Sequence, residues 1–156
     1  MNITSPTQLS FSKITDALNI GVFTIPTESQ AVEYDGRHYI FLNAFLTDAE
    51  QFEEFGHELG HTLLHASDQQ HMAEDYRMYQ EWKANLFALH FCIPTFMLFQ
   101  LKHTQIDCYD LSTLFNVTPQ FAKKRLAIHN QRLLNYQSFI MQNHSKRVTQ
   151  FNYEYY

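Results

Sequence analysis

The run His57-Glu58-Leu59-Gly60-His61 constrains the fold of this chain more than any other feature. In a helix each residue turns by about 100°, so His57 and His61 lie on one face, one turn apart. Two neutral imidazoles in that position can hold one zinc ion at roughly 2.0–2.1 Å each. Glu58 projects to the side, where it can take a proton from a water that the metal activates. The alternative is an ordinary amphipathic helix with two surface histidines.

The residues before this motif predict that it lies in a helix. Thr47-Asp48-Ala49-Glu50 has the Ser/Thr-x-x-Glu pattern of a capping box, so we expect a helix from about Thr47 to Ala66. Gly60 lowers helix propensity by about 1 kcal/mol relative to Ala, which indicates either close passage of another backbone segment or simple tolerance. Apolar residues at spacings of three and four form a stripe suited to a core, namely Phe52, Phe55, Leu59, Leu63 and Leu64.

A second helix is expected to supply a third metal ligand. Glu81 and Asn85 are four residues apart, so both can point from one helix face toward the metal. The interval from His61 to Glu81 is 81 − 61 = 20 residues, which allows a turn and an antiparallel return. Two histidines, one glutamate and an open position are typical of catalytic zinc. Asn85 can accept the N–H of a ligand histidine and so fix its tautomer. The alternative for Glu81 is a solvated carboxylate.

These runs resemble the ImmA/IrrE family of small zinc metallopeptidases. The shared pattern is His-Glu-Leu-Gly-His-x-x-Leu-His, followed about twenty residues later by Glu-x-x-Ala-Asn-x-Phe-Ala and then Ile93-Pro94. The resemblance spans roughly residues 15–130 and implies a minimal zincin-like fold. Members of this family on phages and mobile elements cleave a helix-turn-helix repressor. The resemblance therefore implies a protein substrate of that kind, encoded nearby.

The resemblance also assigns roles to individual residues. It implies that His57, His61 and Glu81 are the zinc ligands and that Glu58 is the catalytic glutamate. Asn85 falls where many related zincins carry a residue that supports a ligand histidine. The implied reaction is hydrolysis of a peptide bond.

Composition limits the remaining possibilities. A chain of 156 residues with 15% aromatic residues is expected to form one folded domain with a substantial core. Cys92 and Cys108 form no Cys-x-x-Cys pattern and are expected to be reduced thiols in a cytoplasmic protein. The start of the chain lacks the pattern of a signal peptide. The most apolar run, residues 86–101, is shorter than the roughly 20 residues of a membrane span.

The pattern of the whole chain predicts a mostly helical α+β fold with a small three-stranded sheet. Asp35-Gly36 is a strong two-residue hairpin signal. We expect residues 1–130 to form the metallopeptidase domain and residues 131–156 a C-terminal helical tail. The other expected elements are a helix over 8–18, strands over 20–25, 31–34 and 37–43, a polar loop over 67–75, the Glu81 helix ending before Pro94, a helix from Pro94 to about 102, and a helix-turn-helix-like segment over 110–127 that turns at Asn116 and resumes at Pro119.

The helix-turn-helix-like segment supports a rival hypothesis of DNA binding. Lys123, Lys124 and Arg125 lie on its second helix. Residues 1–100 carry 4 basic and 13 acidic side chains, whereas residues 101–156 carry 7 and 3. A balance of 7 − 3 = +4 in an acidic chain is a weak electrostatic footprint, so we expect no direct contact with nucleic acid. A third class is a zinc-binding regulator that binds the repressor without efficient proteolysis.

Two further expectations concern the substrate. We expect an extended peptide to add a strand to an edge near residues 39–43, just before the active helix. Candidates for stabilising the oxyanion are Tyr76, Tyr79, His71 and Arg37, among which the sequence does not choose. His65 can orient a loop or act at the site, although a hydrogen-bonded histidine at a helix end is the simpler interpretation.

Overall fold

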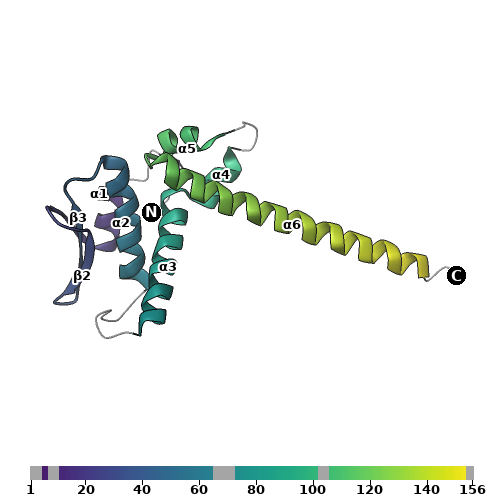
Figure 1. The fold of residues 1–156 in the computed structure, drawn as a ribbon, viewed down its shortest axis with the longest axis horizontal. Helices are drawn as coiled ribbons and strands as arrows, with labels where there is room; N and C mark the ends of the chain where they lie inside the picture. The colour runs from purple at the N-terminus through teal and green to yellow at the C-terminus, as the bar shows by residue number, and fades with distance from the viewer. Residues whose placement is uncertain (1–4, 7–10, 65–72, 102–105, 154–156) are drawn as a thin grey trace.

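The computed structural model describes residues 5–6, 11–64, 73–101 and 106–153, and it has the mostly helical α+β fold that the sequence predicts (Figure 1). Its elements in chain order are α1 (Phe11–Leu18), β1 (Gly21–Ile25), β2 (Gln30–Tyr34), β3 (Arg37–Asn43), α2 (Asp48–Leu64), α3 (Glu74–Cys92), α4 (Thr95–Gln100), α5 (Cys108–Phe115) and α6 (Pro119–Tyr153).

The sheet is mixed, with strand order β1-β3-β2. β3 pairs in parallel with β1 and antiparallel with β2. Asp35 and Gly36 join β2 to β3 with φ angles of 51° and 70°, as a type I′ hairpin turn requires. Because β3 is the central strand, it has no free edge. The expectation that a substrate pairs near residues 39–43 is therefore wrong, and on that side of the sheet β2 is the edge strand.

α2 begins with the predicted capping box. The Thr47 N–H donates to Glu50 Oε2 at 2.9 Å, and the Glu50 N–H donates to Thr47 Oγ1 at 3.3 Å. The core stripe is shorter than expected, because Phe52, Phe55 and Leu59 are buried but Leu63 and Leu64 are exposed. Both leucines lie in the last turn of α2, beyond the part of the helix that the sheet and α3 cover. Ala66 and His65 lie outside the described residues.

Several helix boundaries differ from the prediction. α3 begins at Glu74, inside the expected polar loop, and α4 begins at Thr95 with Pro94 as its N-cap. Asn116 ends α5 in the left-handed conformation, and Pro119 opens α6 as predicted. α6 continues without a break through residue 130 to Tyr153, so the expected tail is an extension of this helix. Residues 8–10, 102 and 154–156 lie outside the described part.

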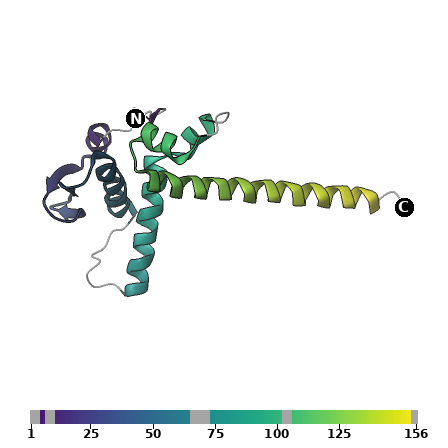
Figure 2. The same cartoon turned by 45° about the horizontal axis from the view of Figure 1, so that its top comes forward.

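Two core clusters meet on α2. One joins α1 and the sheet to α2 through Ile14, Ile40, Leu42, Phe55 and Leu59, with Ile20 beside them. The other joins Phe52 to the end of α3, to α4, to α5 and to the start of α6. Figures 1 and 2 show α6 extending away from this body to a distant C-terminus. α2 is thus held on both sides, which gives the histidine motif a rigid support.

No helix among the described residues is long and apolar enough to cross a membrane. Cys92 is buried, Cys108 is partly buried, and both are free thiols.

Candidate metal centre and active-site cleft

α2 and α3 approach each other closely along a seam of small residues. A Cβ atom built on Gly60 would lie 3.1 Å from the Ala84 Cα and 3.2 Å from the Ala84 carbonyl oxygen. One turn earlier, a Cβ atom on Gly56 would lie 3.0 Å from the Cys92 sulfur. The glycine between the two histidines therefore does mark the close passage of another backbone segment. The pairing of 56 with 92 and of 60 with 84 also makes the two helices antiparallel.

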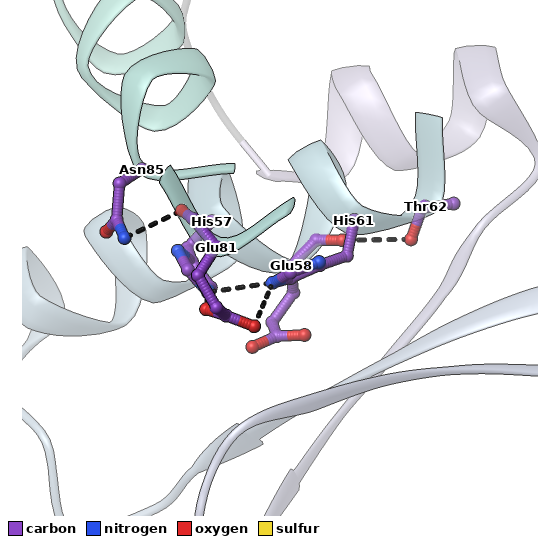
Figure 3. Close-up of polar contacts among 6 residues, drawn as sticks. All are labelled: His57, Glu58, His61, Thr62, Glu81 and Asn85. Carbon is purple, nitrogen blue, oxygen red and sulfur yellow. Dashed lines mark hydrogen bonds and ion pairs between the residues drawn. The ribbon is translucent and has the colours of Figure 1, made fainter. Parts of the chain in front are cut away.

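This seam brings the side chains of three potential metal ligands together (Figure 3). His57 Nε2 lies 3.0 Å from His61 Nε2 and 3.3 Å from Glu81 Oε2, and His61 Nε2 lies 3.4 Å from Glu81 Oε1. The three residues form a group whose ligand atoms all lie within 4.8 Å of one another. A tetrahedral ion with bonds of about 2.0–2.1 Å holds neighbouring ligand atoms about 3.3–3.4 Å apart. The spacing of these side chains therefore fits zinc.

Glu58 lies beside this triad but is buried, whereas the three potential ligands are partly exposed. Its side chain is 7% exposed, and its carboxylate points toward the sheet (Figure 3). Burial, together with the nearby carboxylates of Glu54 and Glu81, raises the pKa of Glu58 to about 7. The backbone N–H of Ala31 donates to this carboxylate and lowers its pKa. A cation bound at the triad would lower it as well, because an opposite charge favours the ionised form.

Asn85 lies on the same face of α3 as Glu81 and also lines the cleft. Its side-chain Nδ2 donates to the backbone carbonyl of Glu81 at 2.8 Å, one turn back in the helix. The amide thus supports the helix that carries Glu81. Its hydrogen bond to a ligand histidine stays a prediction.

An open cleft of ≈ 1170 Å³ surrounds the triad and Glu58. It is bounded by β2 and the segment before it, by α2, by α3 and by the first turns of α6. In the β2–β3 pair, Tyr34 and Arg37 flank the two-residue turn, so the alternation of an antiparallel ladder directs the backbone groups of Ala31 and Glu33 away from β3. The free edge of β2 therefore faces the cleft, as the bond from Ala31 to Glu58 also shows.

Most of the expected oxyanion-stabilising candidates lie elsewhere. Tyr76 and Tyr79 are exposed on α3 and lie in an aromatic row with Trp82. Neither they nor Arg37 are among the described residues that line the cleft. His71 lies outside the described residues. The cleft instead contains His38, whose position in the sequence shows no spacing typical of a metal ligand. The sequence offered one signal for this placement, because a hairpin that turns at Asp35-Gly36 puts His38 opposite Glu33.

The start of α6 packs against α2, which argues against DNA reading by this helix. The Glu53 carboxylate of α2 accepts a hydrogen bond from the backbone N–H of Thr118, just before α6. Arg125 is 0% exposed and therefore cannot reach a DNA groove. Lys124 lines the cleft beside the metal centre. Of the three basic side chains on this predicted recognition helix, one is buried and one lines the cleft that contains the metal centre.

The fold and the site together define a class of protein. A histidine pair on one helix and a glutamate from the next converge beside a buried glutamate, in a cleft edged by a β-strand. This is the arrangement expected of a zincin-like metallopeptidase.

Comparison with known proteins agrees with this class. The IrrE N-terminal-like domain model of the Peptidase_M78 family matches residues 15–127, so this chain belongs to that metallopeptidase family. The chain is 42% identical over 135 residues to the phage-like element PBSX protein XkdA of Bacillus subtilis (strain 168), covering 85% of this chain and 68% of XkdA.

Two further relatives come from Bacillus subtilis and from a Bacillus phage. The chain is 36% identical over 136 residues to the uncharacterized protein YqaB of Bacillus subtilis (strain 168), covering 85% of this chain and 79% of YqaB. It is 30% identical over 95 residues to the uncharacterized immunity region protein 2 of Bacillus phage phi105, covering 58% of this chain and 60% of that protein. Two of the three relatives thus belong to a phage or a phage-like element.

Proposed function

We propose that this protein is a zinc-dependent endopeptidase that cleaves a helix-turn-helix repressor and so derepresses a phage or mobile element. The observation that carries the peptidase part is the spacing of His57, His61 and Glu81 beside the buried Glu58. The names of relatives from a phage-like element and from a phage immunity region support a role in element control. The repressor is proposed to be encoded next to this gene.

The donor set supports zinc as the cofactor. Neutral imidazoles and one carboxylate suit zinc, and three protein ligands leave a position open for catalysis. Zinc, when bound, would polarise the scissile carbonyl and lower the pKa of a water toward about 7. In this proposal His57 and His61 each bind through Nε2 and Glu81 through a carboxylate oxygen.

Glu58 is proposed to move the proton. In its ionised form, the carboxylate accepts a proton from the attacking water and then passes it to the leaving amine. Glu33, through its outward-facing N–H and carbonyl, and Ala31, through its outward-facing carbonyl, are proposed to hold the substrate as an added strand. Since Ala31 already donates to Glu58, a peptide on this edge would lie directly beside the general base.

The test combines metal analysis with a cleavage assay. The wild-type protein is expected to contain about one zinc per chain and to cut the neighbouring repressor into two fragments. Glu58→Gln should lower the cleavage rate by at least about 1000-fold while zinc content stays unchanged, because only proton transfer is lost. His57→Ala should lose both zinc and activity. Glu74→Gln, an exposed glutamate in the first turn of α3, is the matched control and should behave as wild type.

Three results would contradict the proposal. Cleavage retained by Glu58→Gln would defeat the assignment of the general base. A repressor that is bound but left intact would favour the regulatory binding function. A metal-free protein after zinc loading would remove the metallopeptidase mechanism altogether.

A further inference from the structure

The cleft contains more carboxylates than catalysis needs. Apart from Glu58 and Glu81, its lining includes the carboxylates of Glu28, Glu33, Glu53 and Glu54. Lys124 is the single Lys or Arg among the described lining residues. With histidines neutral, these five side chains give a net charge of 1 − 4 = −3. A concave surface with one sign of charge concentrates ligands of the opposite charge.

Three of these carboxylates are available to a ligand. Glu53 is already engaged, because it accepts the Thr118 N–H and lies near Lys124. The salt bridges of the described residues involve His57, His61 and Glu81 and leave Glu28, Glu33 and Glu54 without a cationic partner. A cationic ligand in the cleft would meet carboxylates that no protein cation neutralises, which favours its binding.

The free carboxylates lie on both sides of the catalytic position. Ala31 marks this position because its N–H contacts Glu58. Glu33 follows two residues later on the same face of β2, at about 7 Å, and Glu28 precedes it by three residues, at up to about 10 Å. The Asn43 N–H donates to Ser29 Oγ at 3.1 Å, which holds the segment next to Glu28 against the end of β3. Glu54 lies one helical turn before Glu58 on α2.

We propose that the cleft selects peptide segments that carry Lys or Arg about two residues from the scissile bond on one side and about three residues on the other. This inference rests on the proposed peptidase function. A peptide lying along the edge of β2 brings its side chains past Glu33 at one end and past Glu28 and Glu54 at the other. Such a preference suits a DNA-binding substrate, because DNA-binding segments are rich in Lys and Arg. The same charge repels nucleic acid itself.

Binding to an inactive protein tests the preference without requiring turnover. The protein is the zinc-loaded full chain with Glu58→Gln. The probes are three fluorescein-labelled peptides of one apolar scaffold that differ at those two positions, which carry Lys, Gln or Glu. Fluorescence anisotropy is expected to show that the Lys peptide binds about 10-fold more tightly than the Gln peptide, and the Glu peptide more weakly still. The difference should shrink between about 0.1 M and about 1 M salt, where the Debye length falls to roughly 3 Å.

A second variant identifies the residues responsible. Glu28→Gln together with Glu33→Gln should remove most of the preference for Lys, because these changes neutralise two free carboxylates of the cleft. Glu74→Gln makes the same chemical change on an exposed part of α3 outside the cleft and should keep the full preference. Since neither change affects a proposed metal ligand, zinc content should remain that of the parent protein.

The outcomes separate this inference from the proposed function. Equal affinity for the three peptides, binding of none of them, or a Lys preference that survives in the double variant would overturn the selectivity. If the Lys preference holds while the wild-type protein leaves the neighbouring repressor intact, the proposed repressor cleavage fails and the selectivity stands. If instead the protein cleaves the repressor at a site without basic neighbours, the proposed function stands and the selectivity fails.

Discussion

Arg125 is the largest fully buried side chain in the described part of the molecule. Its Nε donates to the Ile93 carbonyl at 2.9 Å and its Nη2 to Thr95 Oγ1 at 2.8 Å. Ile93 lies at the C-terminal end of α3, where the helix dipole is negative and stabilises a cation. No carboxylate among the described residues forms a salt bridge with Arg125. Its role is therefore to connect α6 to the corner between α3 and α4.

Replacement of this arginine should destabilise the fold. Arg125→Met is expected to lower the free energy of unfolding by about 2–4 kcal/mol, because it leaves the Ile93 carbonyl without its charged donor. Chemical denaturation at neutral pH measures this difference. Lys123→Met, an exposed change on the same helix, should stay within about 0.5 kcal/mol of wild type. Equal effects of the two variants would contradict this role of Arg125.

His90 should make the fold sensitive to acid. Burial, together with the nearby charges of Arg125 and Arg132, lowers the pKa of His90 to about 4. The pKa of His129 is also lowered, by burial and by the same two arginines. Because these folded-state pKa values lie below the unfolded value of 6.5, the unfolded chain binds more protons as the pH falls. The contribution of His90 to stability is complete above about pH 6.5 and is lost toward pH 4, and that of His129 is also lost as the pH falls below 6.5.

Denaturation midpoints across this pH range measure the effect. His90→Gln should flatten the decrease in stability between about pH 6.5 and pH 4, since it removes one proton-binding group of the unfolded chain. The carboxyl of Glu53 acts in the opposite direction, because burial raises its pKa and its contribution decreases as the pH rises above 4.5. An unchanged pH profile in His90→Gln would show that His90 is not responsible.

At the scale of elements, the seam between α2 and α3 determines whether the metal ligands meet. His57 and His61 lie on α2 and Glu81 on α3, so the distance between the helices sets the distance between the ligands. Glycine at position 60 permits this distance because the Ala84 backbone occupies the space of a Cβ. Helix propensity alone would favour alanine there by about 1 kcal/mol. The close approach of the two helices therefore has priority over local helix stability.

Gly60→Ala should weaken zinc binding more than it weakens the fold. The added methyl meets backbone atoms of Ala84 at 3.1–3.2 Å and should displace α3, and with it Glu81, by a few tenths of an ångström. We expect a loss of zinc affinity of about 10-fold, within the range seen when the support of a metal ligand is altered. The strain of about 1–3 kcal/mol is partly offset by the gain in helix propensity. Zinc titration and chemical denaturation measure the two effects.

Gly56→Ala is the comparison for this prediction. Its Cβ would meet the Cys92 sulfur at 3.0 Å and the Phe91 ring at 3.2 Å, which are side-chain atoms that can rotate. This variant should lose stability but keep most of its zinc affinity, because Glu81 lies more than two turns from these contacts. Similar zinc affinities for both variants would contradict the proposed coupling between the seam and the triad.

At the scale of the whole molecule, zinc is expected to link two parts of the chain that are far apart in sequence. The proposed ligands join α2 to α3 across the 19 residues between His61 and Glu81, and α2 and α3 also contact both core clusters. A ligand that binds the folded state alone stabilises it by about 2.7 kcal/mol at 100 times its dissociation constant. The metal centre should therefore contribute to the stability of the whole domain.

Thermal denaturation with and without a chelator measures this contribution. The zinc-loaded protein should unfold at a higher temperature, and a chelator should lower its Tm by several degrees. Glu81→Ala should abolish the difference, whereas Glu58→Gln should retain it because Glu58 is not a proposed ligand. A Tm of the wild-type protein that is the same with and without zinc would contradict the proposed metal centre.

Local patterns in the sequence predicted most of the elements correctly. The capping box at Thr47, the turn at Asp35-Gly36 and the proline that opens α6 were confirmed, because each depends on neighbouring residues alone. The pairing of the histidine motif with Glu81 was also predictable, since helical spacing and ligand chemistry are local properties. The same is true of the family, whose motifs are short runs of residues.

What the sequence determined by itself was therefore the identity of the chemical groups and the helices that carry them. The tertiary structure decided how these groups face one another. It placed β3 at the centre of the sheet and β2 at the cleft, buried Arg125 and brought four additional glutamates around the metal centre. Strand order, burial and the charge of a cleft depend on contacts between residues distant in sequence. No local pattern encodes such contacts, so they are determined only by the folded structure.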